Sequence, residues 1–406
     1  MLELEEALSR ILSLMPAPQR EVVPLHDAIG RVSVDPLTAP ISLPLFDNSA
    51  MDGYAVRAAD VTGASAETPR SLRLIGRTAA GEVFAGEVIA GTCVRVFTGS
   101  PLPRGADAVV MQEDTRTAGR VDGRAPGEVA FLDAAKPWEN VRFAGEDVKA
   151  GTHVANAGER VSAGRASLLA ALGISTIAVA RQPLVGLLAT GSELREAGQT
   201  LAPGQIFESN RLGLGAFGTQ AGGRPQRFPL VTDTLDGTRA ALAEAFAHCD
   251  VVVTSGGVSV GEFDFVKDAF TALGGELNFW KIAIRPGKPF VFGTLGDKFL
   301  FGVPGNPVSA LVTFFLLVRP ALLRWQGASD VGAPSHPGTL TESLTNRGDR
   351  RHFVRVTVDA TGSVRTAGVQ ASHFLSSLAD AQGLVDVPPQ TTLATGQPVR
   401  VLRWDA

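Results

Sequence analysis

Apolar stretches of two kinds alternate through the middle of the chain. Between residues 181 and 327, continuous apolar runs are separated by segments with helical spacing, such as TRAALAEAFAHC and VSALVTFFLLV; the runs are PLVGLLATG, RFPLV, DVVVTSGG and KFLFGVPG. Continuous apolar strands that alternate with helices are typical of a parallel sheet covered on both faces. We therefore expect a central parallel α/β sheet domain over residues 181–327.

The flanking regions have shorter, strand-like patterns. Runs such as RSLRLIGR and DAVVMQED, separated by Gly, Pro and Asp, predict a β-rich domain over residues 47–142. HFVRVTVDATGSVRTAGV and PVRVLRW predict a second β domain over residues 328–406. Residues 1–46 and 143–180, which begin with an amphipathic helix, are assigned to an N-terminal, linking domain. The expected fold class is therefore multidomain, α/β plus β.

Composition narrows the class of protein. The 37 Lys and Arg against 41 Asp and Glu give a net charge of −4, which argues against nucleic-acid binding. The first residues are acidic rather than basic, and the longest apolar run, residues 310–318, is about half of a bilayer span, so we expect neither a secretory signal nor a membrane protein. Cys93 and Cys249 lie far apart with no CxxC, which favours a reducing cytoplasm.

Three glycine-bearing loops follow apolar strands. They are residues 190–193, 255–261 and 304–307. The carboxyl ends of parallel strands meet at one sheet edge, where ligands bind. Such loops can hold phosphate through backbone N–H groups and helix N-termini, although glycine there can equally serve only tight turns. None matches GxxxxGK[ST] or GxGxxG, which excludes a P-loop ATPase and the usual dinucleotide fold.

A cationic stretch, WKIAIRPGKP, lies between the second and third loops. In an extended conformation Lys281 and Arg285 point the same way, and Lys288 follows after a turn. Two of only six lysines lie in this stretch. The pattern favours neutralisation of a polyanionic substrate, and the alternative is a solvated strand face.

Carboxylates flank the same predicted edge. Glu193, Asp233 and Asp264 could hold a divalent ion that bridges phosphate oxygens, or could cap the following helices. A second polar segment, FDNSAMDGYA, contains Tyr54, the only tyrosine, and is either functional or simple turn chemistry.

The motifs occur in a characteristic order: FDNSAMDGYAVR, FTGSPLPRGADAVVMQED, VRFAGEDV, TGSEL, TSGGVSVGEFD, KIAIRPGKPF and GVPGNPVSA. With them the chain resembles the molybdopterin molybdenumtransferase family, which includes bacterial MoeA-like proteins and the E domain of gephyrin, over essentially its whole length. The resemblance implies a cytoplasmic homodimer of four-domain subunits. Its α/β domain would be similar to molybdopterin adenylyltransferase, and its C-terminal domain would be a β barrel.

The activity implied by the resemblance is insertion of molybdenum from molybdate into adenylylated molybdopterin, with release of AMP and with Mg²⁺ as cofactor. Implied partners are the molybdopterin adenylyltransferase and molybdoenzyme-maturation proteins. In the resulting hypothesis the glycine loops hold the pyrophosphate, Lys281, Arg285 and Mg²⁺ offset its charge, and Asp52 completes the cleft from the β-rich domain of the same or the other subunit.

Carried over motif by motif, the resemblance and the loop pattern together give three sets of site residues. The expected catalytic residues are Asp52, Thr98, Asp147, Glu193, Lys281, Arg285 and Arg355. The expected cofactor-binding residues are Gly191, Ser255, Gly256, Gly257, Ser259, Gly261, Lys288, Pro304, Gly305, Asn306 and Ser376. The expected metal ligands are Asp233 and Asp264. Arg285 replaces the usual Lys, which keeps the charge but excludes a role that needs a neutral amine.

Two other functions compete with this hypothesis. Adenylylation of molybdopterin by ATP would use a similar α/β domain, but would need no equivalent of residues 1–180 or 328–406. A non-catalytic, gephyrin-like scaffold would call for a long linker and a second α/β domain, which 406 residues do not contain. Both cysteines lie outside the motifs, so no covalent nucleophile is expected.

Overall fold

The computed structural model describes residues 1–117, 127–258 and 264–404, and the chain divides into two compact units. The first consists of Met1–Asp35, Asn156–Ser162 and Thr176–Ala406, and the second of Pro36–Ala155 and Ala163–Ser175. Each unit is considered by itself. The four domain boundaries expected from the sequence are finer than this division and stay a prediction.

The first unit contains a six-stranded sheet in the order β16-β13-β17-β21-β20-β18. Its strands are β13 (Leu184–Ala189), β16 (Arg224–Arg227), β17 (Val251–Ser255), β18 (Glu276–Lys281), β20 (Pro289–Leu295) and β21 (Lys298–Val303). The first four strands in the order are parallel, whereas β20 and β18 run antiparallel to their neighbours. The expected parallel sheet is therefore mixed, because the two residues between β20 and β21 form a hairpin, which can join only antiparallel strands.

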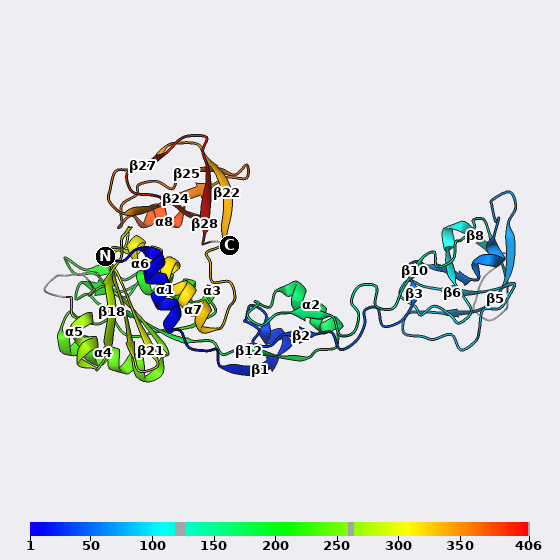
Figure 1. The fold of residues 1–406 in the computed structure, drawn as a ribbon, viewed down its shortest axis with the longest axis horizontal. Helices are drawn as coiled ribbons and strands as arrows, with labels where there is room; N and C mark the ends of the chain where they lie inside the picture. Colours follow the sequence, from blue (N-terminus) through cyan, green and yellow to red (C-terminus); the bar gives the residue numbers. More distant parts are fainter. Residues whose placement is uncertain (118–126, 259–263, 405–406) are drawn as a thin grey trace. The chain divides into compact units, whose positions relative to one another are not determined.

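Helices cover both faces of this sheet (Figure 1). On one face, α4 (Leu235–His248) and α5 (Val266–Ala272) pack into a buried cluster with the strands. The other face carries α1 (Leu4–Leu14), α3 (Asn210–Gln220), α6 (Pro307–Thr313), a π-helical turn (Phe314–Val318) and α7 (Arg319–Trp325). The alternation of strands and helices over residues 181–327 thus produces the expected layered arrangement.

Helix α3 was not among the elements expected from the sequence. Its three glycines allow a close approach to neighbouring elements: a Cβ on Gly213 would lie 3.0 Å from Leu311 of α6, and one on Gly218 would lie 3.2 Å from Pro225 of β16. The neighbouring strand was expected over residues 227–231 but ends at Arg227. Pro229 cannot donate to a sheet, which explains the early end.

The segment Pro307–Trp325 is long and apolar enough to cross a bilayer by length and composition. However, 89% of its most apolar window is buried inside the fold, against α1, α3 and the sheet. It is therefore the central core helix of this unit.

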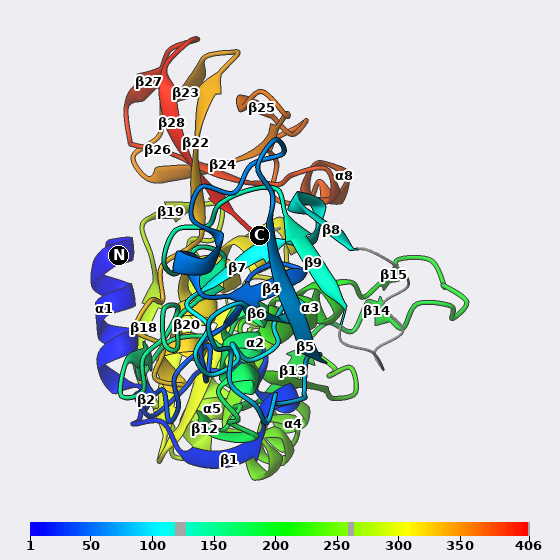
Figure 2. The ribbon, with the colours of Figure 1, turned by 90° about the vertical axis from the view of Figure 1, so that its right-hand side faces the viewer.

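The C-terminal strands of the first unit close into a five-stranded barrel (Figure 2). They are β22 (Ser335–Leu340), β24 (Arg351–Val358), β25 (Ser363–Thr366), β26 (Gly383–Val387) and β28 (Pro398–Arg403), and the ring closes because β26 pairs with both β24 and β28. The expected C-terminal β barrel is confirmed. Trp404 fixes it to the helical layer by packing against Phe217 and Phe315, with ring centroids 6.1 and 5.9 Å away.

Short elements complete the first unit. They are β1 (Arg20–Pro24), β12 (Thr176–Ala180), β14 (Leu194–Arg195), β15 (Ile206–Phe207), β19 (Ile284–Arg285), β23 (Leu344–Asn346), β27 (Thr391–Leu393) and α8 (Leu375–Ala379). Of these, β19 adds to the barrel strand β24, and β14 pairs with β15.

The second unit is β-rich, as expected for residues 47–142. Its six-stranded sheet comprises β4 (Gly53–Val56), β5 (Arg70–Thr78), β6 (Thr92–Val96), β7 (Ala108–Met111), β8 (Thr115–Thr117) and β9 (Glu128–Phe131). Outside the sheet lie β2 (Leu37–Thr38), β3 (Asn48–Ser49), β10 (Val141–Arg142), β11 (His153–Ala155) and α2 (Ala163–Ala171). Tyr54 is only 5% exposed and packs edge-on against Phe131, so it is a core residue of this sheet.

We expect the N-terminal helix to contribute to the stability of the first unit. Ile11 is fully buried in the main core cluster, so Ile11→Ala should lower the free energy of unfolding by about 2–5 kcal/mol. Leu14, at 42% exposure on the same helix, provides the control, and Leu14→Ala should change the value by less than about 1 kcal/mol. The fluorescence of the buried Trp325 and Trp404 in a urea titration measures the free energy of unfolding of both variants. If Ile11→Ala lowered it no more than Leu14→Ala, α1 would not be part of this core.

Candidate functional site

A pocket of about 750 Å³ lies at the carboxyl ends of β13, β17 and β21, and we call it the strand-end pocket. All three glycine loops contribute to its wall, because the three strands are parallel neighbours in the sheet. Ten of the residues expected at the site line it: Gly191, Glu193, Asp233, Ser255, Gly256, Gly257, Asp264, Pro304, Gly305 and Asn306. Ser259 and Gly261 lie outside the described residues.

Glycine is required at the second loop by conformation and by space. Gly256 and Gly257 have φ values of +89° and +65°, which L side chains rarely adopt. A Cβ on either residue would also lie 2.9 Å from Oγ1 of Thr190. These glycines therefore let the loop after β17 lie directly against the loop after β13.

Only part of the expected backbone cradle is available to a ligand. The amide of Gly191 donates to the carbonyl of Val231, and that of Gly256 donates to the carbonyl of Val303, each at 3.1 Å. By contrast, the amides of Gly257 and Gly305 donate no hydrogen bond within the described part of the chain. The amides of Gly257 and Gly305 are therefore candidates for anion binding.

Helix capping does not account for Asp233 and Glu193. Thr234 is the residue that caps α4, since its side chain accepts from the amide of Gly237 at 3.2 Å. Asp233 instead accepts from the amide of Ser192 at 2.9 Å, which ties the two chain segments together. Glu193 comes directly before the short strand β14, so it has no helix to cap. Both acids line the pocket, so a ligand-related role remains for each.

The described wall of the strand-end pocket contains no Lys or Arg, in contrast to its four acids Glu193, Glu208, Asp233 and Asp264. The expected cations lie elsewhere: Lys281 ends β18, whereas Arg285 belongs to β19 and pairs with the barrel strand. The stretch is therefore divided between two sheets and is not one extended strand. Lys288 is exposed after this bend and does not line the described pocket. Their roles stay predictions.

Arg355 is almost completely buried, at 1% exposure, and does not face the pocket. Its Nη2 donates to the carbonyl oxygens of Val369 and Ala371, at 2.7 and 3.1 Å, and burial lowers its pKa to about 10. The segment that it holds leads directly to His373 and Leu375, which do line the pocket. The geometry makes Arg355 a positioning residue, whereas Ser376 is exposed and outside the pocket wall.

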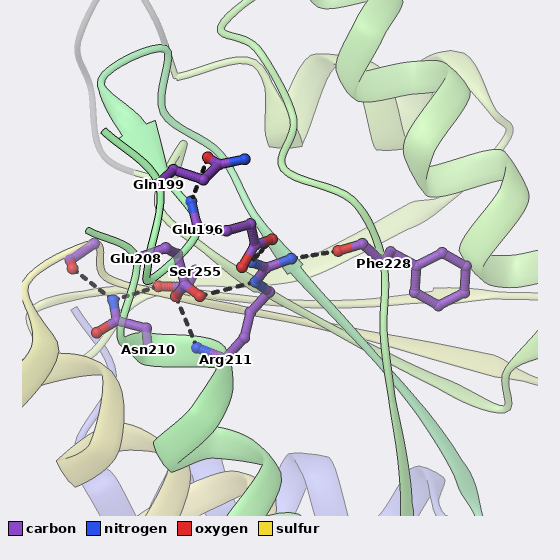
Figure 3. Close-up of polar contacts among 8 residues, drawn as sticks. Glu196, Gln199, Glu208, Asn210, Arg211, Phe228 and Ser255 are labelled. Atoms are coloured by element: carbon purple, nitrogen blue, oxygen red, sulfur yellow. Dashed lines mark hydrogen bonds and ion pairs between the residues drawn. The ribbon is translucent and has the colours of Figure 1, made fainter. Parts of the chain in front are cut away.

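An ion-pair network around the buried Arg211 supports the part of the pocket wall that contains Glu208 and Asn210 (Figure 3). The guanidinium of Arg211, 3% exposed, donates to Glu208 at 2.9 Å, to Glu196 at 2.5 Å and to the carbonyl oxygen of Phe228. The neighbouring Asn210 donates from Nδ2 to Ser255 Oγ and to the carbonyl oxygen of Gly305, both at 2.7 Å. The start of α3 is thereby fixed against the loops after β17 and β21.

Several pocket residues were missed by the sequence reasoning: Thr190, Phe207, Asn210, His373 and Leu375. Thr190 begins a loop that was recognised, so its position could have been found. Asn210 is the first residue of the unexpected helix α3, and Phe207 ends the strand β15 just before it. His373 and Leu375 come from the segment between the barrel strands β25 and β26. The resemblance had placed Ser376, which lies beside His373 and Leu375, at the site, whereas no motif indicated the segment around α3.

In the second unit, two of the expected catalytic residues contact each other. Asp52 Oδ1 accepts from the amide and from Oγ1 of Thr98, at 2.8 and 2.9 Å. These bonds, the backbone one first, lower the pKa of Asp52 below its ordinary value. Asp147 is exposed, and its amide donates to the carbonyl of Leu43 at 3.1 Å.

Neither cysteine is available as a nucleophile. Both are buried, and burial raises the pKa of Cys93 to about 12 and that of Cys249 to about 11. Neither lines the strand-end pocket. A thiol at such a pKa is protonated at neutral pH and unreactive.

Comparison with known proteins gives matches along nearly the whole chain. Residues 2–173 match the MoeA N-terminal region (domain I and II), residues 186–324 a probable molybdopterin binding domain, and residues 337–404 the MoeA C-terminal region (domain IV). A molybdopterin molybdenumtransferase of Haemophilus influenzae is 39% identical over 93% of this chain and 92% of its own length.

Two further proteins extend this comparison. Molybdopterin molybdenumtransferase 2 of Mycobacterium tuberculosis is 39% identical over 97% of both chains. A solved molybdopterin biosynthesis MoeA protein of Pyrococcus horikoshii aligns over the full length of both chains, with 33% identity and a TM-score of 0.81.

The pairing of Asp52 with Thr98 predicts a measurable pKa change. Thr98→Val removes the hydroxyl donor but keeps the stronger backbone donor, so the pKa of Asp52 should rise only part of the way towards its ordinary value. A pH titration of the side-chain carboxyl resonance by NMR measures this. Thr62→Val, which removes a hydroxyl bonded to Ala58, should leave the Asp52 titration unchanged. An unchanged titration in the Thr98 variant would contradict the assignment.

Proposed function

The chain belongs to the molybdopterin molybdenumtransferase family, and we propose that it inserts molybdenum from molybdate into adenylylated molybdopterin, releasing AMP. It is a transferase of molybdenum cofactor biosynthesis. The observation that carries the proposal is the strand-end pocket, which lies in the segment matching a molybdopterin binding domain and combines glycine loops with carboxylates. Since relatives match nearly the full length, neither a stand-alone adenylyltransferase nor a non-catalytic scaffold is favoured.

The pocket has the size and the donors that this substrate needs. Its volume of about 750 Å³ falls within the range of about 300–1,000 Å³ that is usual for small-molecule sites. Adenylylated molybdopterin carries a phosphoanhydride, whose oxygens accept hydrogen bonds. The uncommitted amides of Gly257 and Gly305 would donate to these oxygens at the ends of β17 and β21.

The acidic wall of the pocket fits a bound divalent cation. A polyanionic substrate beside Glu193, Asp233 and Asp264 would be repelled unless a cation lay between them. Among the described residues no group of three or more His, Cys, Asp or Glu side chains is placed to hold a metal ion. A site with so few protein ligands suits Mg²⁺, because Mg²⁺ commonly binds one or two carboxylates together with substrate phosphates. Asp233 and Asp264 would hold it, and it would neutralise charge that builds up on the phosphate oxygens.

The residues of the chain itself position the reacting groups. Arg211 fixes the start of α3, and Arg355 fixes the barrel segment that carries His373 into the pocket wall. We further propose that Asp52, Thr98 and Asp147 of the second unit take part in the reaction, and that Lys281, Arg285 and Lys288 attract the anionic substrates. A cytoplasmic homodimer that meets the preceding adenylyltransferase and maturation proteins is part of the same proposal.

The direct test is the reaction itself. Purified protein with adenylylated molybdopterin, molybdate and Mg²⁺ should release AMP, and omission of molybdate or addition of EDTA should abolish the release. Asp52→Ala should lower the rate at least tenfold if the second unit takes part, whereas Asp60→Ala, an acid of the same unit outside the motifs, should not. Absence of molybdate-dependent AMP would refute the proposed function.

The proposed metal ligands predict a shift in metal dependence. Asp233→Asn keeps the acceptor for the Ser192 amide but removes the negative charge, so the Mg²⁺ concentration for half-maximal AMP release should rise about tenfold or more. Asp236, an exposed acid in the first turn of α4 that does not line the pocket, supplies the control. If Asp236→Asn shifted the Mg²⁺ dependence equally, the effect would be one of general charge.

A further inference from the structure

Two polar atoms in the wall of the strand-end pocket are buried without a partner. They are Oγ1 of Thr190 and Oδ1 of Asn210, in residues that are 9% and 8% exposed. Neither atom has a hydrogen-bond partner among the described residues. Burial of an unsatisfied polar group costs about 1–3 kcal/mol, so each such group in a native structure calls for an explanation.

The orientation of the Asn210 amide is determined by its surroundings. One of its two contacts, the carbonyl oxygen of Gly305 at 2.7 Å, can only accept a hydrogen bond. The side-chain nitrogen must therefore point there, and it also donates to Ser255 Oγ. Figure 3 shows the oxygen of Asn210 pointing away from both contacts. This oxygen can only accept a hydrogen bond or ligate a cation.

Ser255 connects Asn210 with Thr190. Its hydroxyl accepts from Asn210, and its carbonyl oxygen accepts from the amide of Thr190 at 3.0 Å. Close contact with Gly256 and Gly257 restricts the Thr190 side chain, and these glycines provide no side-chain partner for its hydroxyl. Thr190 and Asn210 are therefore joined through Ser255 in the pocket wall.

We propose that Thr190 Oγ1 and Asn210 Oδ1 bind the polar edge of a planar nitrogen heterocycle of the substrate. This inference rests on the proposed function and names the part of the pocket that recognises the ring. Phosphate and molybdate oxygens accept hydrogen bonds, so they would be repelled by Oδ1 of Asn210. The edge of such a ring carries an N–H donor next to an acceptor. The N–H group would donate to Oδ1 of Asn210, and the acceptor would take a hydrogen bond from the hydroxyl of Thr190. The side chain of Phe207, 46% exposed in the same wall, offers an aromatic face for the ring.

Two rings of adenylylated molybdopterin have such an edge. The pterin carries an amino group and ring N–H beside a carbonyl, and the adenine carries an amino group beside a ring nitrogen. Two pairs of ligands, one for each ring, show whether the pocket binds the adenine or the pterin. AMP is compared with purine riboside 5′-monophosphate, which lacks the amino group, and pterin is compared with lumazine, which has oxygen in place of the amino group.

Three isosteric or near-isosteric variants test the residues. Thr190→Val removes only the unpartnered hydroxyl, and Asn210→Leu removes the amide. Thr254→Val is the matched control, because Thr254 Oγ1 is also buried and unpartnered but its residue does not line the pocket. Thr190→Val and Thr254→Val should each leave the melting temperature unchanged or higher, since no hydrogen bond within the described structure is lost.

Isothermal titration calorimetry in the presence of Mg²⁺ measures the affinity of each ligand. In the wild-type protein we expect the amino-bearing member of one pair to bind about five- to tenfold more tightly, equivalent to one hydrogen bond. Thr190→Val should reduce this preference, Asn210→Leu should abolish it and Thr254→Val should retain it. The pair that shows the effect identifies the ring.

Three results would each overturn the inference. The first is equal affinity for both members of each ligand pair in the wild-type protein, and the second is a preference for the amino-bearing ligand that survives in Asn210→Leu. The third is weaker binding of Mg²⁺ alone by Thr190→Val, which would show that these oxygens are cation ligands. Binding of separate ligands does not require turnover. A wild-type protein that releases no AMP therefore refutes the proposed function, whereas one that releases AMP while Asn210→Leu keeps the preference refutes only this inference.

Discussion

The buried guanidinium of Arg211 is the interaction on which the geometry of the pocket depends. It joins three separate parts of the chain, through Glu196, Glu208 and the carbonyl oxygen of Phe228. The side chain of Glu208 is only 5% exposed, so removal of the Arg211 guanidinium would leave the Glu208 carboxylate buried without its counter-ion. Loss of one partner of a buried ion pair typically destabilises a protein by about 3–5 kcal/mol. Because Arg211 is the second residue of α3, this ion pair fixes the start of the helix. Asn210 is thereby held against the loops of β17 and β21.

A second constraint is the sign of the charge inside the pocket. The protein has a net charge of −4, and the described pocket wall is acidic, although the expected substrates are anions. The low dielectric of a partly enclosed pocket strengthens this repulsion. The proposed divalent cation would resolve this conflict more directly than lysines outside the described pocket wall, because it would lie between the two sets of negative oxygens. The acidic lining therefore supports the proposed metal-binding role of the carboxylates at the sheet edge.

The sequence predicted the part of the site that follows from strand ends. Three apolar strands followed by glycine loops had to meet at one edge once the strands were parallel neighbours, and ten expected residues line the resulting pocket. Helix α3 escaped prediction because Gly213, Gly215 and Gly218 lower helix propensity, and their benefit is tertiary: they allow contact with α6 and the sheet. Similarly, the separation of Lys281 from Arg285 arises because residues 284–285 pair with a barrel strand, a long-range contact that no local pattern encodes.

The same close packing explains why polar atoms remain unsatisfied in the pocket wall. The loops after β13 and β17 can touch only because Gly256 and Gly257 lack side chains, and this removes the groups that could have satisfied Thr190 Oγ1. The side-chain nitrogen of Asn210 donates to the loops after β17 and β21, and the side-chain oxygen receives no hydrogen bond from the described residues. Each unsatisfied group costs about 1–3 kcal/mol in the free protein. A ligand that supplies the missing donor and acceptor recovers that free energy on binding, so the packing that brings the loops together also creates the selectivity of the pocket.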